Sequence, residues 1–119
     1  YAQNRNWFWP NDNGRGGNCI CGETCDWNAD GKRCWFTDYL PHWDYRQKGA
    51  LDYSVANALS WITKAAPPGD RIDGFRLDAI KHVEDPWLTT LRSRVQAEVV
   101  SKMPAGSRFY MVGETFSYS

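Results

Sequence analysis

The sequence has no excess of charge of either sign. Its 119 residues contain 14 Lys or Arg and 14 Asp or Glu, and no segment carries a basic stripe. Proteins that bind nucleic acids or anionic membranes by electrostatic attraction usually show a net positive charge or a basic cluster. We therefore expect neither nucleic acid nor a membrane as a partner.

Long apolar runs are also missing. No stretch approaches the roughly 20 apolar residues that a transmembrane helix needs. The chain opens on Tyr-Ala-Gln-Asn, without the basic start and apolar run of a signal peptide, so we expect the numbering to begin inside a longer precursor. Hydrophobic residues still make up 42% of the chain and aromatic residues 15%, which is typical of a globular protein.

Aliphatic residues are scarce in residues 1–50. This block is rich in Asn, Asp, Gly and Trp and has no sustained periodicity, which predicts irregular loops with short strands. It holds all the cysteines in a C-x-C-x3-C-x8-C pattern: Cys19, Cys21, Cys25 and Cys34. An even number of cysteines in a core-poor stretch predicts two disulfides and an oxidising compartment.

The cysteine pattern leaves two questions open. A tetrahedral zinc site is the alternative to disulfides, although the paired C-x2-C spacing usual for zinc is absent. The spacing does not fix the disulfide pairing either, but Cys19–Cys34 with Cys21–Cys25 would nest a small loop inside a larger one.

Residues 51–119 contain two segments with helical periodicity. The first has an apolar face and ends before Pro67; the face is formed by Leu51, Val55, Leu59 and Ile62 and widened by Ala58 and Trp61. The second has Asp85 as its N-cap and Pro86 in the first helical position, and it is stopped by Pro104. Its apolar face is formed by Leu88, Leu91, Val95 and Val99.

Two strand patterns flank the second helix. The first runs from Ile72 to Asp78 and the second from Arg108 to Glu114. The second is nearly continuously apolar over residues 109–112, which is typical of a strand buried on both faces. A right-handed crossover makes two such strands parallel, so Asp78 and Glu114 are expected at the same C-terminal edge of a sheet.

Two carboxylates at one sheet edge suit retaining glycoside hydrolysis. One ionised carboxylate attacks the anomeric carbon and one protonated carboxyl supplies the leaving oxygen with its proton, the two being about 5–5.5 Å apart. Arg76 lies one pleat period before Asp78, on the same face, and favours the charged form of Asp78; a more apolar setting would keep Glu114 protonated. The alternative is that both are ordinary strand-end carboxylates.

The residues that surround these carboxylates carry a family resemblance. Asp-Gly-Phe-Arg-Leu-Asp-Ala-Ile-Lys-His-Val at 73–83 resembles the nucleophile motif of the α-amylase family of glycoside hydrolases, and Val-Gly-Glu-Thr-Phe at 112–116 resembles its acid/base motif. The resemblance implies that Asp78 is the nucleophile, Glu114 the general acid and base, and Arg76 the residue that keeps the nucleophile ionised. It also implies that Lys81 and His82 line the leaving-group side of the substrate cleft.

The resemblance implies an α/β fold of a known kind. A complete (β/α)8 TIM barrel takes about 250 residues, so this chain would span part of one, without the family's first and last conserved motifs and the third catalytic aspartate of the last. Residues 1–50 would form a domain B-like segment, and residues 51–119 the third helix, fourth strand, fourth helix and fifth strand. The implied activity is retaining cleavage of α-glucans such as starch, by hydrolysis or glycosyl transfer.

Other residues of the first block gain expected roles from the resemblance. Trp7 and Trp9 could stack on sugar rings in the cleft wall, or they could pack a small core. A Leu-Pro-His-Trp motif ends the block, and His42 stands where the family often has a calcium-binding aspartate. Calcium, if bound, would use Asp44 or Asp38 and the backbone carbonyl of His82.

Two further expectations concern the chain as a whole. A fragment of a barrel leaves open sheet edges, so we expect copies to associate as a homo-oligomer through those edges. The cysteines and the polymeric substrate predict a secreted or periplasmic protein. The alternative function is a non-catalytic carbohydrate-binding or assembly fragment of such an enzyme.

Overall fold

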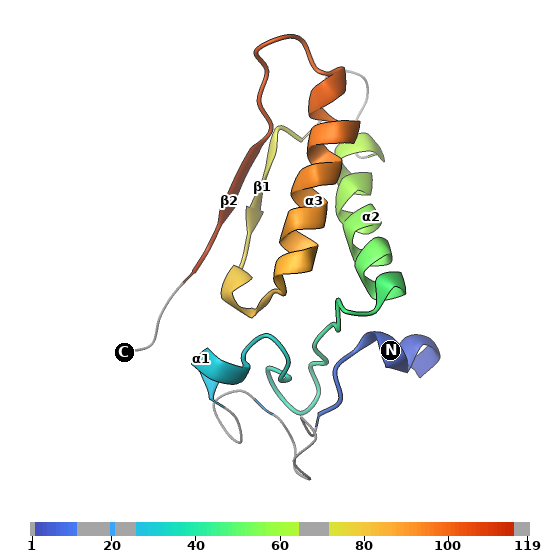
Figure 1. The fold of residues 1–119 in the computed structure, drawn as a ribbon, viewed down its shortest axis with the longest axis vertical. Helices are drawn as coiled ribbons and strands as arrows, with labels where there is room; N and C mark the ends of the chain where they lie inside the picture. Colours follow the sequence, from blue (N-terminus) through green and yellow to red (C-terminus); the bar gives the residue numbers. More distant parts are fainter. Residues whose placement is uncertain (1, 12–19, 21–25, 65–71, 116–119) are drawn as a thin grey trace.

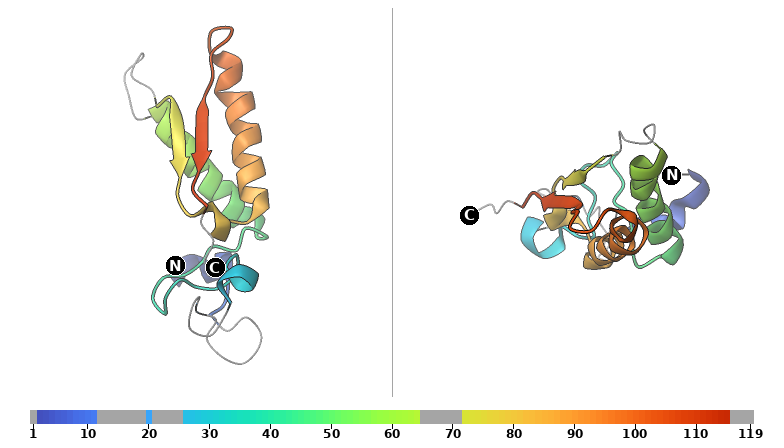
Figure 2. Two further views of the ribbon diagram at one scale, coloured as in Figure 1. Left: turned by 90° about the vertical axis from the view of Figure 1, so that its left-hand side faces the viewer. Right: turned by 90° about the horizontal axis from the view of Figure 1, so that it is seen from above.

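A computed structural model describes residues 2–11, 20, 26–64 and 72–115. Two long helices lie side by side and cover one face of a small sheet, and the irregular N-terminal segment lies at one end of this layer pair (Figures 1 and 2). The helices are α2 (Lys48–Lys64) and α3 (Asp85–Glu98), and the strands are β1 (Gly74–Leu77) and β2 (Tyr110–Gly113). The short elements are η1 (Ala2–Trp7), α1 (Trp27–Asp30), η2 (Ile80–His82) and η3 (Val100–Lys102).

The sheet confirms the predicted strand–helix–strand unit. Strands β1 and β2 pair in parallel, with Gly74 opposite Tyr110 and Leu77 opposite Gly113. Both strands are shorter than the sequence predicted, although backbone hydrogen bonds extend the pairing at each end. The chain is therefore a mixed helix and strand domain built, in its described part, on a two-stranded parallel sheet.

The core confirms most of the two predicted helix faces, although Leu88 is not among the residues of the core cluster. Its buried residues come from α2, α3 and the residue after α3: Val55, Leu59, Ile62, Leu91, Val95 and Val99. Alternate residues of the strands pack against this cluster, namely Phe75 and Leu77 from β1 and Met111 from β2. The apolar residues of each helix recur about every 3.6 residues and so form one face. Both helices pack with this face against the same side of the sheet.

The prediction that the second strand is buried on both faces is wrong for this structure. Tyr110 is 69% exposed and Val112 is 43% exposed. Side chains alternate along a strand, and the helices cover only one face of the sheet, so every second residue points away from the core. Trp61 was expected to widen the face of α2, but it is 60% exposed.

The predicted start of the second helix is also wrong by one residue. Asp85 is the first residue of α3 and Glu84 is its N-cap, without a side-chain capping bond. The Glu84 carboxylate instead accepts the backbone N–H of Tyr45 at 2.5 Å. A contact across 39 residues therefore takes the place of a local cap. The helix ends at Glu98 and continues as η3, ahead of Pro104.

Aromatic rings attach the N-terminal segment to the two helices. Trp43 stacks on Tyr45 with ring centroids 6.1 Å apart, and Tyr45 stacks on Trp87 of α3 at 6.1 Å. Trp7 contacts Tyr53 of α2 at 5.6 Å. The segment is thus fixed at the C-terminal ends of the strands, where β1 runs into η2 (Figure 1). No helix in the described ranges is long and apolar enough to cross a membrane.

Gly74 lets the two strands approach closely. A Cβ atom added at Gly74 would lie 2.3 Å from the carbonyl oxygen of Tyr110, a backbone atom with little freedom to move. We expect Gly74→Ala to lower the free energy of unfolding by about 1–3 kcal/mol, because the added carbon forces the strands apart. Denaturant titration measures this loss.

Val112→Thr is the control for Gly74→Ala. It is a near-isosteric change at a half-exposed position of the other strand, and we expect it to leave stability within about 0.5 kcal/mol of the original. Equal stability of the two variants would show that the close approach at Gly74 does not hold in solution.

Candidate active site

The two candidate catalytic carboxylates follow directly on the paired strand ends. Leu77 lies opposite Gly113, so Asp78 and Glu114 are the next residues on each strand. The N–H of Glu114 donates to the carbonyl of Leu77 at 2.8 Å, and the N–H of Ile80 donates to the carbonyl of Glu114 at 3.0 Å. These two bonds join the Glu114 backbone to residues before and after Asp78 in the chain. Asp78 and Glu114 therefore lie at the same edge of the sheet, as predicted.

Arg76 lies between the two carboxylates. Its guanidinium nitrogens lie 3.8 Å from Asp78 Oδ1 and 3.3 Å from Glu114 Oε2. The side chains of Arg76, Asp78 and Glu114 are 64%, 74% and 42% exposed, so these ion pairs add little to stability. They bring one positive and two negative groups together, and Arg76 lies beside Asp78 as its spacing predicted. The more apolar setting expected for Glu114 is not found, because its carboxylate is 42% exposed and lies nearer to Arg76 than that of Asp78 does.

The residue after Asp78 has an unusual backbone conformation. Ala79 has φ 47° and ψ 40°, in the left-handed region that residues with a side chain rarely occupy. This conformation turns the chain sharply from β1 into η2, and the Ala79 carbonyl accepts the N–H of His82 at 2.9 Å. Strained backbone of this kind is held in place by its surroundings and is common at functional sites.

Lys81 and His82 connect η2 to the N-terminal segment. Lys81 Nζ donates to Asn28 Oδ1 at 2.6 Å, and the His82 ring donates from Nδ1 to the Gly31 carbonyl at 3.1 Å. The His82 ring also meets the edge of Trp27, with centroids 5.0 Å apart. Both residues follow Asp78 closely in the sequence. Their side chains contact the N-terminal segment.

Trp7 and Trp9 take part in packing. Trp7 is half-buried and contacts Trp43 as well as Tyr53. The Trp9 carbonyl accepts the indole N–H of Trp35 at 2.7 Å, and the Arg46 guanidinium lies 3.6 Å from the centre of a Trp9 ring. The structure thus gives both rings partners within the chain, in line with the packing alternative; their contact with sugar stays a prediction.

Asp44, a predicted calcium ligand, is engaged by a cation of the protein. It is 3% exposed, and its carboxylate accepts two hydrogen bonds from the Arg46 guanidinium at 2.8 Å each. Burial disfavours its charged form, but the bonds from Arg46 outweigh burial and lower the pKa of Asp44. A calcium ion at Asp44 would have to displace this guanidinium. Asp38, the other predicted ligand, is exposed, and the described residues contain no group of three or more His, Cys, Asp or Glu suited to a metal ion.

His42, which replaces the family's aspartate, lies between backbone carbonyls. Its Nδ1 is 2.9 Å from the Cys34 carbonyl oxygen, and the ring also bonds the backbone of His82. Burial lowers the pKa of His42 below its usual value, against the raising effect of these carbonyls. Burial likewise lowers the pKa of His82. Both rings are therefore mainly neutral at pH 7, and their hydrogen bonds link the N-terminal segment to η2.

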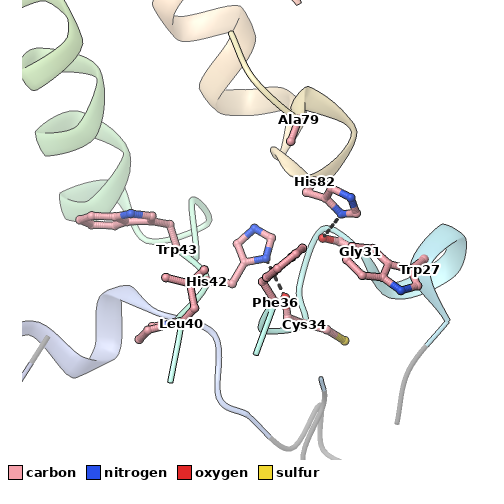
Figure 3. A pocket seen from close by; sticks show the side chains of 10 residues that line it. Trp27, Gly31, Cys34, Phe36, Leu40, His42, Trp43, Ala79 and His82 are labelled. Atoms are coloured by element: carbon pink, nitrogen blue, oxygen red, sulfur yellow. Dashed lines mark hydrogen bonds between the residues drawn. The ribbon is translucent and has the colours of Figure 1, made fainter. Parts of the chain in front are cut away.

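A pocket that the sequence did not predict lies beside these two rings (Figure 3). It has a volume of about 250 Å³ and lies between the N-terminal segment and the loop after Asp78. Its wall consists of Trp27, Gly31, Cys34, Phe36, Leu40, Pro41, His42, Trp43, Ala79 and His82. We call it the junction pocket. The sequence signal for it was only an aromatic-rich block without periodicity.

The disulfide prediction falls largely outside the described part of the chain. Cys34 is buried, at 1% exposure. Cys19, Cys21 and Cys25 lie outside the described residues, so the pairing stays a prediction.

Comparisons with known proteins found no relative of this chain. No family model matches the chain, and no match was found among curated proteins or solved structures. We therefore infer the function from the two motifs and from the geometry of Asp78, Glu114 and Arg76.

Proposed function

We propose that the chain is part of an α-amylase-type glycoside hydrolase that cleaves α-glucans, such as starch and maltooligosaccharides, with retention of configuration. One observation carries this proposal. Asp78 and Glu114 follow the paired ends of parallel strands and lie within 4 Å of the same Arg76 guanidinium. The shared guanidinium keeps the two carboxyl groups close to each other, and retaining enzymes hold theirs about 5–5.5 Å apart. Retention itself is proposed from the resemblance of the two motifs.

The proposed reaction has two displacements. In the first, an Asp78 oxygen bonds to the anomeric carbon while the glycosidic C–O bond breaks, and Glu114 gives its proton to the leaving oxygen. In the second, Glu114 takes a proton from water, and the water oxygen displaces Asp78 from the sugar. A sugar hydroxyl in place of water would give glycosyl transfer. Arg76 presents its positive charge to both carboxylates.

We further propose that the described helices and strands are a segment of a (β/α)8 barrel. Support comes from the order helix, strand, helix, strand, from the parallel pairing of β1 and β2, and from the helices on one face of the sheet. The carboxylates lie at the C-terminal strand ends, where barrel enzymes hold their catalytic groups. A secreted or periplasmic location agrees with this substrate class.

Association of copies is a separate part of the proposal. In the described sheet, β1 and β2 each have one strand neighbour, so each leaves an edge open to pair with another chain. We propose that copies of the chain associate through these edges. Light scattering that finds a monodisperse monomer with cooperative unfolding would contradict this.

Reducing-sugar release from soluble starch tests the hydrolase proposal. We expect the purified chain to release reducing sugar and Glu114→Gln to lower the rate about 100- to 10,000-fold, because the variant cannot protonate the leaving oxygen. The oligomeric state is determined on the same sample. Glu98→Gln makes the same chemical change at an exposed position of α3 and should leave the rate unchanged. Activity that survives in Glu114→Gln would refute the assignment.

The alternative is a fragment that binds α-glucan without cleaving it. It is favoured by the exposure of the Asp78 side chain, 74%, because a working site usually excludes water from the reacting groups. This alternative predicts that maltooligosaccharides change the tryptophan fluorescence of the chain while no reducing sugar appears.

A further inference from the structure

We propose that the junction pocket binds a neutral aromatic ring, carried as the leaving group of an aryl α-glycoside. This inference builds on the proposed function and adds a substrate class to it. Ala79, which follows Asp78, forms part of the pocket wall. The pocket wall thus begins one residue along the chain from the proposed nucleophile, and the side chains of Asp78 and Glu114 lie outside it.

The chemistry of the wall favours an apolar ring over a sugar. The polar groups of the wall side chains are the Cys34 sulfur, the indole N–H groups of Trp27 and Trp43, and two imidazoles. Both imidazoles bond backbone carbonyls: His42 those of Cys34 and His82, and His82 that of Gly31. The wall therefore offers few partners for the several hydroxyl groups of a sugar. A buried sugar hydroxyl without a protein partner loses its bonds to water, which costs about 1–3 kcal/mol per group. A phenyl ring has no hydroxyl to satisfy and gains from leaving water.

The size of the pocket suits a single ring with small substituents. Its volume is about 250 Å³, whereas a cavity of about 150 Å³ lined by apolar side chains is enough to bind benzene. Drug-sized ligands usually need about 300–1,000 Å³. The volume of the pocket therefore matches one ring with small substituents.

Aromatic side chains in the wall can hold the ring by its faces and edges. Trp27 and Phe36 meet edge to face, with centroids 5.4 Å apart at an angle of 73°. Figure 3 shows Trp43 and Leu40 on one side of the pocket, Trp27, Gly31 and His82 on the other, and His42 between them. Aromatic contacts of this kind add about 0.5–1.5 kcal/mol per pair beyond the burial of area.

Calorimetric titration of the full chain with two glucosides tests the proposal. Phenyl α-glucoside and methyl α-glucoside share the sugar and differ in the leaving group, and titration into Asp78→Asn prevents turnover. We expect the phenyl glucoside to bind at least about tenfold more tightly. Equal affinities would overturn the proposal.

Two variants localise the effect. Leu40→Asp puts a charge into the pocket wall at a side chain that is 51% exposed, so the fold should tolerate it, and we expect the tenfold preference to disappear. Tyr39→Asp adds the same charge at the neighbouring residue, which is 79% exposed and outside the wall, and should keep the preference. A preference that survives in Leu40→Asp would overturn the proposed location.

Phenol alone separates failure of this inference from failure of the proposed function. No phenol binding would overturn the pocket inference, while starch cleavage that depends on Glu114 would stand. Phenol binding that is lost in Leu40→Asp, without any preference between the two glucosides, would overturn the link between the pocket and glycoside cleavage.

Discussion

Asp78→Asn is expected to abolish covalent trapping of the protein by a mechanism-based α-glucoside inhibitor. The asparagine amide is a poor nucleophile, so no bond forms to the anomeric carbon, and turnover of any active form should fall by about 10,000-fold or more. Intact-protein mass spectrometry measures the trapped glycosyl adduct. Arg76 stays in place beside the amide, so the change removes the nucleophile while leaving its neighbours.

Asp73→Asn is the matched control for this experiment. Asp73 is an exposed residue before β1 whose backbone carbonyl pairs with Tyr110, and this backbone bond does not depend on the side chain. We expect the inhibitor to trap the control variant at the same rate as the original protein. Trapping of Asp78→Asn at the original rate would mean that another residue is the nucleophile.

Leu91→Ala is expected to cause a larger loss of stability than Gly74→Ala. Leu91 is 1% exposed and lies in the cluster between α2 and α3, with partly buried side chains of the sheet packed against it. Removing three buried carbons leaves a cavity in a close-packed core, so the free energy of unfolding should fall by about 2–5 kcal/mol. Urea titration followed by circular dichroism measures this change.

Gln96→Ala serves as the comparison in the same helix. Gln96 is exposed, and alanine has a slightly higher helix propensity, so stability should stay within about 0.5 kcal/mol of the original. If Leu91→Ala and Gln96→Ala were equally stable, the core between α2 and α3 would not form in solution.

Local periodicity accounts for the parts of the fold that the sequence predicted. The apolar residues of α2 and α3 recur at helical spacing, and the segments around Phe75 and Met111 have strand character. Such patterns depend on neighbours a few residues apart, so they can be read without a structure. The connection rule for parallel strands then placed Asp78 and Glu114 at one edge, and the structure agrees.

The wrong predictions of burial have a common cause, which is the number of layers that pack against the sheet and the helices. Tyr110, Val112 and Trp61 were expected to be buried because they are apolar, but burial needs a neighbour on that side. The helices cover one face of the sheet, and the sequence does not state which faces have a covering layer. The N-cap error at Asp85 arose similarly, because the Glu84 carboxylate is engaged by the distant Tyr45 backbone.

The sequence by itself determined the order of helices and strands, most of the core-facing residues of the helices and the position of the two carboxylates on one sheet edge, since these follow from spacing along the chain. Only the tertiary structure decided how the N-terminal segment meets that edge. The Asn28 contact of Lys81, the Arg46 pairing of Asp44 and the apolar junction pocket depend on which side chains meet in space. Loops without periodicity carry no local signal for such contacts, because their conformation is set by the surfaces they pack against.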